Sequence, residues 1–296
     1  MNTKPNNSQH SPPTEPTSIA NLLAEARRRL LAAGIESAGL EARLLVGYQL
    51  NMDATRLIAH GEQALSDDQI GAVRALINQR VDGVPVAYLL GQREFWSLPL
   101  RVDEYCLIPR PDTELLVERA LGRLPDGPAR VIDLGTGSGA IILALKSERP
   151  RIEAWASDTS SGALAIAAAN ARDLRLDVHW FRGHWLDAVS PRPWFDMIVS
   201  NPPYIGASDP HLEQGDLRFE PRSALVAAGS GLSDLATIVR QAGRCLRPGG
   251  WLLLEHGHTQ APLIRRMFEE HAFVAIASHR DPAGHERVTE GRLADE

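Results

Sequence analysis

A glycine-rich turn is the first part of the sequence in which the residue types suggest chemistry. The apolar run Val131 to Leu134 predicts a short strand, which leads directly into Asp133-Leu134-Gly135-Thr136-Gly137-Ser138-Gly139. Glycines in such a turn let the backbone approach a ligand closely, and the N–H groups of the helix predicted from Ile141 can bind polar or anionic atoms. The pattern indicates a nucleotide-like ligand, although a tight strand-to-helix turn has the same composition.

Asp158 follows the next predicted strand, residues 152–156, and lies 23 residues beyond Gly135. An acidic side chain at the carboxyl end of that strand can accept hydrogen bonds from both hydroxyls of a ribose. The alternative is that Asp158 caps the helix that follows it. Because Gly135, Gly137 and Ala140 also fit the pattern G-x-G-x-x-[GA], these two features allow either a dinucleotide or S-adenosylmethionine.

A third motif, Asn201-Pro202-Pro203-Tyr204, follows the strand predicted over residues 195–199. The two prolines stiffen the backbone and remove N–H donors, so that carbonyl oxygens and the Asn201 amide can accept hydrogen bonds from a planar NH₂ group. Such acceptance favours the attacking geometry of the nitrogen and stabilises its developing positive charge, and Tyr204 can stack on the planar group. The motif therefore favours S-adenosylmethionine as the ligand, and a Pro-rich turn is the alternative.

The sequence lacks the residue patterns of thiol, metal and serine hydrolase chemistry. The two cysteines, Cys106 and Cys245, are far apart and form no C-x-x-C pair. His256 and His258 have no further ligands at metal-binding spacing, and no G-x-S-x-G motif is present. We therefore expect neither a metal site nor serine hydrolase chemistry.

The elements that must position these motifs begin after a polar, Pro-rich stretch, residues 1–17, which we expect to be a disordered tail. Apolar residues then recur every three or four positions over residues 19–31 and 37–50, and Ser66 opens a further helix as its N-cap. The apolar sides of the first two helices include Leu31, Leu40, Leu44 and Tyr48. Residues 18–91 are therefore predicted to form a small all-helical domain.

The remaining chain is predicted to contain a hairpin and linker over residues 92–112 and a catalytic domain over residues 113–296. In the catalytic domain, short apolar runs alternate with helices, which is typical of β-α-β units in a parallel sheet. The predicted strands are residues 131–134, 152–156, 178–181, 195–199, 251–254 and 273–277.

Over residues 19–290 the sequence resembles the HemK/PrmC protein glutamine-N5 methyltransferases, which act on bacterial peptide-release factors. The resemblance rests on blocks in a fixed order behind a helical N-terminal domain. The blocks are Ile108-Pro109-Arg110-Pro111-Asp112-Thr113-Glu114, the loop 133–139, Ser200 to Tyr204, Arg218-Phe219-Glu220-Pro221 and Glu255-His256-Gly257. The resemblance implies an α/β fold, a Rossmann-like seven-stranded S-adenosylmethionine-dependent methyltransferase domain preceded by a small all-helical domain.

The resemblance also implies roles for particular residues. The cofactor-binding residues would be Asp133, Gly135, Thr136, Gly137, Ser138, Gly139, Asp158, Trp185 and Asn201, with Asp158 at the ribose and Trp185 beside the adenine. Trp180 and Trp194 are the alternatives to Trp185. Asn201, Pro202, Pro203 and Tyr204 would hold the glutamine, with Asn201, Pro202 and Tyr204 catalytic. The block 110–114 would close over the cofactor, and Glu220 and Glu255 would be structural supports.

The implied activity is transfer of a methyl group from S-adenosyl-L-methionine to the side-chain N5 of a glutamine, in a Gly-Gly-Gln loop, of peptide-release factors. Residues 18–91 would dock this protein substrate. An adenine-N6 or guanine-N2 methyltransferase of nucleic acid is the alternative, because it needs the same four-residue motif. A binding protein of the same fold without activity is a third reading, against which Asn201 and Tyr204 argue.

Composition narrows the class of protein. With 296 residues, 44% hydrophobic and 23% charged, the chain is typical of a soluble globular protein of two domains. A formal net charge of −6 disfavours stable binding to nucleic acid. No uncharged stretch is long enough to span a membrane, and residues 1–18 lack the apolar core of a signal peptide. We expect a cytoplasmic monomer without a metal.

Overall fold

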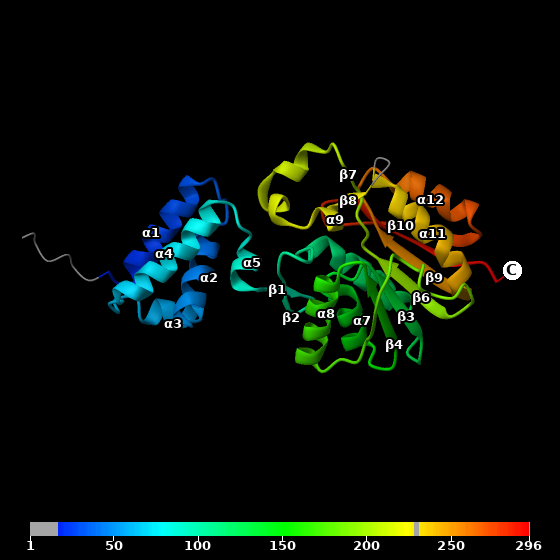
Figure 1. Ribbon diagram of the computed structural model, residues 1–296, viewed down its shortest axis with the longest axis horizontal. Coiled ribbons are helices and arrows are strands. Elements are labelled where there is room, and N and C mark those ends of the chain that lie inside the picture. Colours follow the sequence, from blue (N-terminus) through cyan, green and yellow to red (C-terminus); the bar gives the residue numbers. More distant parts are fainter. Residues whose placement is uncertain (1–16, 228–230, 296) are drawn as a thin grey trace, which may run out of the picture. The chain divides into compact units, whose positions relative to one another are not determined.

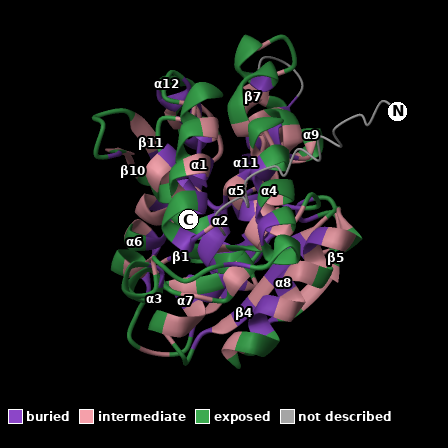
Figure 2. Ribbon diagram, turned by 90° about the vertical axis from the view of Figure 1, so that its left-hand side faces the viewer, coloured by how far each residue is buried: buried purple, intermediate pink, exposed green. Residues whose placement is uncertain are grey.

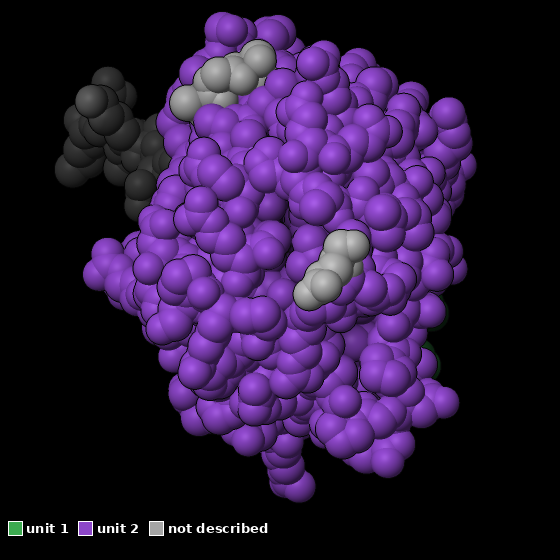
Figure 3. Space-filling view, turned by 90° about the vertical axis from the view of Figure 1, so that its right-hand side faces the viewer, with its two compact units in different colours: residues 1–89 green, residues 90–296 purple. Residues whose placement is uncertain are grey.

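The computed structural model describes residues 17–227 and 231–295. The chain divides into two compact units, residues 1–89 and residues 90–296 (Figure 1). The face drawn in Figure 3 consists almost entirely of the second unit. The disordered tail predicted for residues 1–17 lies outside the described residues, apart from Thr17. Within the described ranges, no helix has the length and apolar character needed to cross a membrane.

The first unit is helical. Its helices are α1 (Ile19–Ala32), α2 (Ala38–Leu50), α3 (Ala54–Ala59), α4 (Asp67–Val81) and the start of α5 (Val86–Leu90). Ser66 caps α4 as predicted, because its hydroxyl accepts the Gln69 N–H while the Gln69 side chain accepts the Ser66 N–H. Sequence periodicity thus located the long helices, whereas the short α3 and α5 were not predicted.

Four of the residues assigned from the sequence to the apolar sides of the first two helices are exposed, so the prediction that they face the core of this unit is wrong. The exposed fractions are 59% for Leu31, 54% for Leu40, 41% for Leu44 and 53% for Tyr48. Figure 2 shows buried and exposed segments along the same helices. Helix α2 is apolar on more than one side, and it packs the side that contains Ala42 against α1 and α4. Leu40, Leu44 and Tyr48, four residues apart, remain outside as one row, here called the α2 stripe.

A β-hairpin opens the second unit, as the sequence predicts. Strands β1 (Gln92–Phe95) and β2 (Leu98–Arg101) pair antiparallel, with Phe95 opposite Leu98. The two turn residues, Trp96 and Ser97, both have positive φ, 51° and 58°. This is the backbone of a tight turn whose twist matches that of the two strands.

The second unit is built on a seven-stranded sheet in the order β10-β11-β9-β6-β3-β4-β5. Its strands are β3 (Arg130–Leu134), β4 (Glu153–Asp158), β5 (His179–Arg182), β6 (Phe195–Ser200), β9 (Leu246–Glu255), β10 (Phe273–Arg280) and β11 (Glu286–Leu293). The five strands from β9 to β5 are parallel, and β11 pairs antiparallel with both β9 and β10. The predicted fold class is confirmed.

Strand β11 was not predicted, because its sequence is polar. It contains Thr289 and Glu290, which are completely buried. Arg119 and Arg123 of helix α6 (Glu114–Arg123) form ion pairs with Glu290, so the buried charge is compensated. A pattern of apolar residues cannot reveal a strand whose burial depends on partners elsewhere in the chain.

Helices cover both faces of the sheet (Figure 1). Helices α6 and α7 (Ala140–Glu148) pack on one face, together with α8 (Ser161–Leu174). Helices α11 (Ser233–Cys245) and α12 (Ala261–Glu270) pack on the other. Because strands β3, β4, β6 and β9 are parallel, their carboxyl ends lie at the same edge of the sheet. Ligands bind at this edge in folds of this kind.

Two irregular segments lie over this edge. One leads from the hairpin into η1 (Pro111–Thr113), a single turn of 3-10 helix before α6. The other follows β6 and contains only short elements, namely β7 (Ile205–Gly206), η2 (Pro210–Glu213), η3 (Gly215–Phe219), α9 (Arg222–Leu225) and β8 (Val226–Ala227). Both segments contribute to the cavities described next.

Candidate active site

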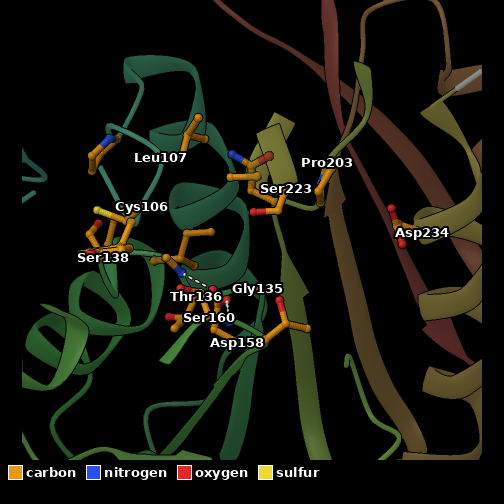
Figure 4. A pocket seen from close by; sticks show the side chains of 18 of the residues that line it. Cys106, Leu107, Gly135, Thr136, Ser138, Asp158, Ser160, Pro203, Ser223 and Asp234 are labelled. Carbon is orange, nitrogen blue, oxygen red and sulfur yellow. Dashed lines mark hydrogen bonds between the residues drawn. The ribbon is translucent and has the colours of Figure 1, made fainter. Parts of the chain in front are cut away.

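A cavity of about 330 Å³ opens at the carboxyl ends of β3, β4 and β6. Figure 4 shows Thr136, Asp158 and Ser160 together on one wall, with Asp234 of α11 on the opposite side. Leu107 and Cys106, which precede η1, lie along another part of the wall. The volume is within the range of small-molecule and cofactor sites.

The three glycines after β3 adopt backbone conformations that other residues rarely take. The φ angles are +69° at Gly135, +56° at Gly137 and +85° at Gly139. Gly135 and Gly137 line the cavity, and a Cβ atom on Gly135 would lie only 3.1 Å from the Trp185 ring. Gly139 lies behind the loop, where a Cβ would be 3.0 Å from Leu143 of α7.

Asp133 lies beneath the loop and is not among the residues that line the cavity. Its side chain is completely buried, and its Oδ2 accepts a hydrogen bond of 2.7 Å from the Thr136 hydroxyl. Burial raises the pKa of Asp133 to about 7. Thr136 and Ser138 do line the cavity, so Asp133 affects the cavity only by holding the Thr136 side chain of the loop in place.

Asp158 ends β4, and its carboxylate faces the cavity while holding two backbone groups. Oδ2 accepts the Gly137 N–H at 3.0 Å, and Oδ1 accepts the Ser160 N–H at 2.8 Å. Burial raises the pKa of Asp158, and these N–H donors oppose that shift. Each carboxylate oxygen can accept more than one hydrogen bond, so the side chain keeps capacity for a ligand.

Of the three tryptophans considered from the sequence, only Trp185 lines the cavity. Its ring packs on Gly135, and its Nε1 donates a hydrogen bond of 3.2 Å to Asp234 Oδ1. Trp180 packs against the core on one sheet face, and the Trp194 ring lies under the guanidinium groups of Arg130 and Arg192. The alternatives to Trp185 are thus placed elsewhere.

The residues Asn201 to Tyr204 are divided between two cavities. Pro203 lines the large cavity, whereas Pro202 and Tyr204 line a second cavity of about 70 Å³. Asn201 lines both, so the two spaces meet at its side chain. Ser200 holds the start of this segment in place, because its hydroxyl donates to the Leu134 carbonyl oxygen at 2.7 Å.

Two buried groups hold the Asn201 and Tyr204 side chains. Asn201 Nδ2 donates a hydrogen bond of 3.1 Å to Thr113 Oγ1, and the Tyr204 hydroxyl donates to Glu255 Oε1 at 3.4 Å. Burial raises the pKa of Glu255 to about 7, and it also raises the pKa of Tyr204. Tyr204 is therefore protonated near neutral pH and cannot act as a base.

Arg110 also lines both cavities, and its guanidinium forms an ion pair with Glu220. Glu220 is 4% exposed, and its second oxygen accepts the Ile108 N–H at 3.4 Å. Burial raises the pKa of Glu220, which the Arg110 charge opposes. This carboxylate thus fastens the segment before η1 to the segment after β7.

The residues of the wall that were not predicted include Cys106, His184 and Asp234. Cys106 lines the large cavity, and burial raises the pKa of its thiol to about 12, so it stays protonated. His184 and Asp234 lie near Trp185 and also line the cavity. An acidic residue in the first turn of a helix at the ligand edge was the available signal for Asp234. Across the described ranges, no cluster of His, Cys, Asp and Glu could hold a metal ion.

Comparison with known proteins adds to this geometry. The family model described as the PrmC N-terminal domain matches residues 21–91, and the methyltransferase small domain matches residues 111–215. A release factor glutamine methyltransferase of Escherichia coli (strain K12) is 48% identical over 271 residues, which cover 91% of this chain and 97% of that protein. One from Salmonella typhimurium is 50% identical over 254 residues, covering 86% and 91%. The chain belongs to the release factor glutamine methyltransferase family.

This membership confirms the resemblance to the HemK/PrmC proteins that the sequence motifs indicate. Among solved structures, a methyltransferase from Pyrococcus furiosus aligns with a TM-score of 0.51 at 15% identity, covering 67% of this chain and 89% of that one. At this identity the match speaks for the fold alone, and it agrees with the sheet described above.

Proposed function

We propose that the protein transfers a methyl group from S-adenosyl-L-methionine to the side-chain amide N5 of a glutamine in a bacterial peptide-release factor. Membership of the family supports this activity. The observation that carries it is the position of Asn201, which lines both the large cavity and the small one. A donor in the first and an amide in the second would meet at this side chain.

The large cavity fits the methyl donor. Gly135, Thr136, Gly137 and Ser138 would hold its methionine part, with Gly139 and Asp133 shaping the loop. The half-buried Asp158 carboxylate would accept hydrogen bonds from the ribose, and Trp185 would lie beside the adenine. The close approach of Gly135 to the Trp185 ring supports this assignment, because a side chain at position 135 would occupy space in the cavity beside that ring.

When bound, S-adenosylmethionine would supply an electrophilic methyl group. The methyl group would pass to the glutamine nitrogen with the electron pair of its bond left on sulfur, and that nitrogen would lose one proton to water. The chain's own part is to hold and polarise the amide. The Asn201 side-chain oxygen and the Pro202 carbonyl oxygen would accept hydrogen bonds from the two amide hydrogens. This favours a pyramidal nitrogen and stabilises the positive charge that develops on it.

Tyr204 would pack on the glutamine amide in the small cavity, and Pro203 would shape the passage between the cavities. Because Tyr204 stays protonated, it would orient the amide and not remove its proton. Asn201, Pro202 and Tyr204 are therefore proposed as catalytic, and Pro203 as part of the glutamine site.

The alternative, methylation of an adenine or guanine amino group, is less well supported. The small cavity of about 70 Å³ suits a side-chain amide better than a purine ring. The net charge of −6 also disfavours stable binding to a polyanion.

We assign docking of the release factor to the helical domain, residues 18–91, with catalysis in residues 113–296. The helical unit contributes none of the residues that line either cavity. Its α2 stripe presents three large apolar side chains, 41–54% exposed, and exposed apolar groups of this kind are typical of protein-binding surfaces. We further propose that the protein works as a monomer in the cytoplasm, with no stable nucleic-acid partner.

The test is an in vitro assay with methyl-labelled S-adenosylmethionine and purified release factor, DNA or RNA in separate reactions. Label should enter the release factor alone, and replacing its loop glutamine by asparagine should abolish incorporation. The matched control is the Asn201→Ala enzyme, which should leave the release factor unlabelled. Label that enters only nucleic acid would overturn the assignment.

A further inference from the structure

The amide of Asn201 has two ends of similar shape and opposite hydrogen-bonding character. Its oxygen is an acceptor, while its NH₂ group is a donor. In the proposed reaction the glutamine amide presents N–H donors, so only the oxygen of Asn201 can hold it. Because the two ends have nearly the same shape, packing alone does not choose between them, and a hydrogen bond must do so.

Thr113 makes that choice. Its Oγ1 accepts a hydrogen bond of 3.1 Å from Asn201 Nδ2, which leaves the oxygen of Asn201 free for the cavities. We propose that Thr113 is a positioning residue that fixes the polarity of the Asn201 amide. The proposal rests on the function argued above and adds a residue to its machinery.

The position of Thr113 is well defined by its surroundings. It is 4% exposed and lies at the end of η1, directly before α6. Its backbone N–H donates to the Arg110 carbonyl oxygen at 3.1 Å, which closes the turn. The side chain therefore approaches Asn201 from a rigid element, although 88 residues separate the two in sequence.

Glu255 supports the arrangement from the neighbouring strand. Ser200, the last residue of β6, pairs with Leu254 of β9, so Asn201 directly after β6 lies level with Glu255 at the end of β9. Glu255 is 1% exposed, and the Thr113 and Tyr204 hydroxyls both favour its charged form as hydrogen-bond donors. A hydroxyl that donates its hydrogen bond to Glu255 presents its lone pairs to Asn201. Glu255 thus contacts Tyr204 directly and acts on Asn201 only through Thr113.

The experiment compares Thr113→Val with Thr113→Ser in the full chain. Valine keeps the shape and removes the hydroxyl, whereas serine keeps the hydroxyl. Thr113→Val should lower kcat by about 10- to 100-fold, somewhat less than loss of a direct electrostatic partner. Both KM for the release factor and the Kd of S-adenosylmethionine, measured by calorimetry, should change by less than about threefold. Thr113→Ser should restore kcat to within about threefold of the original enzyme.

Thr289→Val is the matched control for loss of a buried, hydrogen-bonded threonine. Thr289 is completely buried and bonds His256 Nε2 at 2.8 Å, but it lines neither cavity. It should lower Tm without lowering kcat. If Thr113→Val keeps its kcat, or if Thr113→Ser is as impaired as Thr113→Val, the positioning role is wrong.

A second readout does not depend on turnover. In ¹⁵N-labelled protein, the side-chain NH₂ resonances of Asn201, assigned by their loss in Asn201→Ala, should shift in Thr113→Val and return towards their original position in Thr113→Ser. Unchanged resonances in Thr113→Val would refute the hydrogen bond. Failure of the original enzyme to methylate release factor would instead refute the proposed function, and the resonances would still report on Thr113.

Discussion

The backbone N–H of Gly137 donates a hydrogen bond of 3.0 Å to Asp158 Oδ2. This contact ties the glycine loop after β3 to the carboxyl end of β4, so the two motifs form one wall of the large cavity. Asp158 has a double task in this arrangement, because it fixes the loop and also faces the cavity.

We predict that Asp158→Ala weakens S-adenosylmethionine binding by about 1 to 3 kcal/mol, the scale of hydrogen bonds to a charged acceptor. Calorimetry with S-adenosylmethionine and its demethylated product measures this. NAD should not bind to either enzyme. Binding of NAD in place of S-adenosylmethionine by the unmodified protein would contradict the assignment of the cavity.

Asn201→Ala should lower kcat by about 10² to 10³, because the acceptor that polarises the amide is lost. Cofactor affinity should change little, since the glycine loop, Asp158 and Trp185 are intact. Steady-state kinetics on the release factor together with calorimetry separate the two effects. Nearly full kcat in the variant would mean that Asn201 is only a turn residue.

Gly231→Ala should damage the active site through Tyr204. Gly231 has a φ of +84°, and a Cβ atom there would lie 2.1 Å from the Tyr204 carbonyl oxygen. The substitution must displace the backbone of the motif, so we expect kcat/KM to fall at least about tenfold and Tm to fall by several degrees.

Gly284→Ala is the control for backbone strain alone, because Gly284 has a φ of +85° and a Cβ atom there would have nothing within 4 Å. It should lower Tm slightly and leave kcat/KM unchanged. Equal effects of the two substitutions on kcat/KM would show that contact with Tyr204 is unimportant.

Stability should depend on pH through Glu255. Burial raises its pKa to about 7, so the folded protein binds more protons than the unfolded chain between about pH 4.5 and pH 7. The free energy of unfolding must then fall as the pH rises through this window. The Glu255→Gln variant has no group that titrates at this position, so it lacks this pH-dependent contribution to the free energy of unfolding. The Tm of the original protein minus the Tm of the variant should therefore be larger at pH 5 than at pH 8.

Thermal denaturation at several pH values measures this difference, and each kcal/mol corresponds to roughly 2–4 °C. A Tm difference that is constant from pH 5 to pH 8, or that grows with pH, would show that the Glu255 pKa is not raised by folding.

Serine substitutions at Leu40, Leu44 and Tyr48 together should reduce kcat/KM for the intact release factor by about tenfold or more, because the α2 stripe loses its apolar area. Methylation of a short Gly-Gly-Gln peptide should be unaffected, since the peptide reaches only the cavities. Ile58→Ser is the matched control, as Ile58 on α3 is 78% exposed and lies outside the stripe. Unchanged kcat/KM on the intact protein would refute the docking role of the stripe.

The sequence by itself determined the positions of the motifs that consist of adjacent residues. The glycine loop, Asp158 and the residues 201–204 could be located because each follows an apolar strand in a parallel sheet, whose carboxyl ends meet at one edge. Alternation of helices with short apolar runs sufficed for the fold class. Local spacing is enough wherever the decisive contacts lie within a turn or at the end of a strand.

Only the tertiary structure decided which side chains support that chemistry. Thr113 and Asn201 are 88 residues apart, and no local pattern connects them. The same holds for β11, because its buried Glu290 is paired with two arginines of α6. It also holds for α2, which is apolar on several sides, so the sequence did not indicate which side packs against the other helices. Burial and hydrogen bonding depend on what the fold brings into contact, and that is a property of distant segments together.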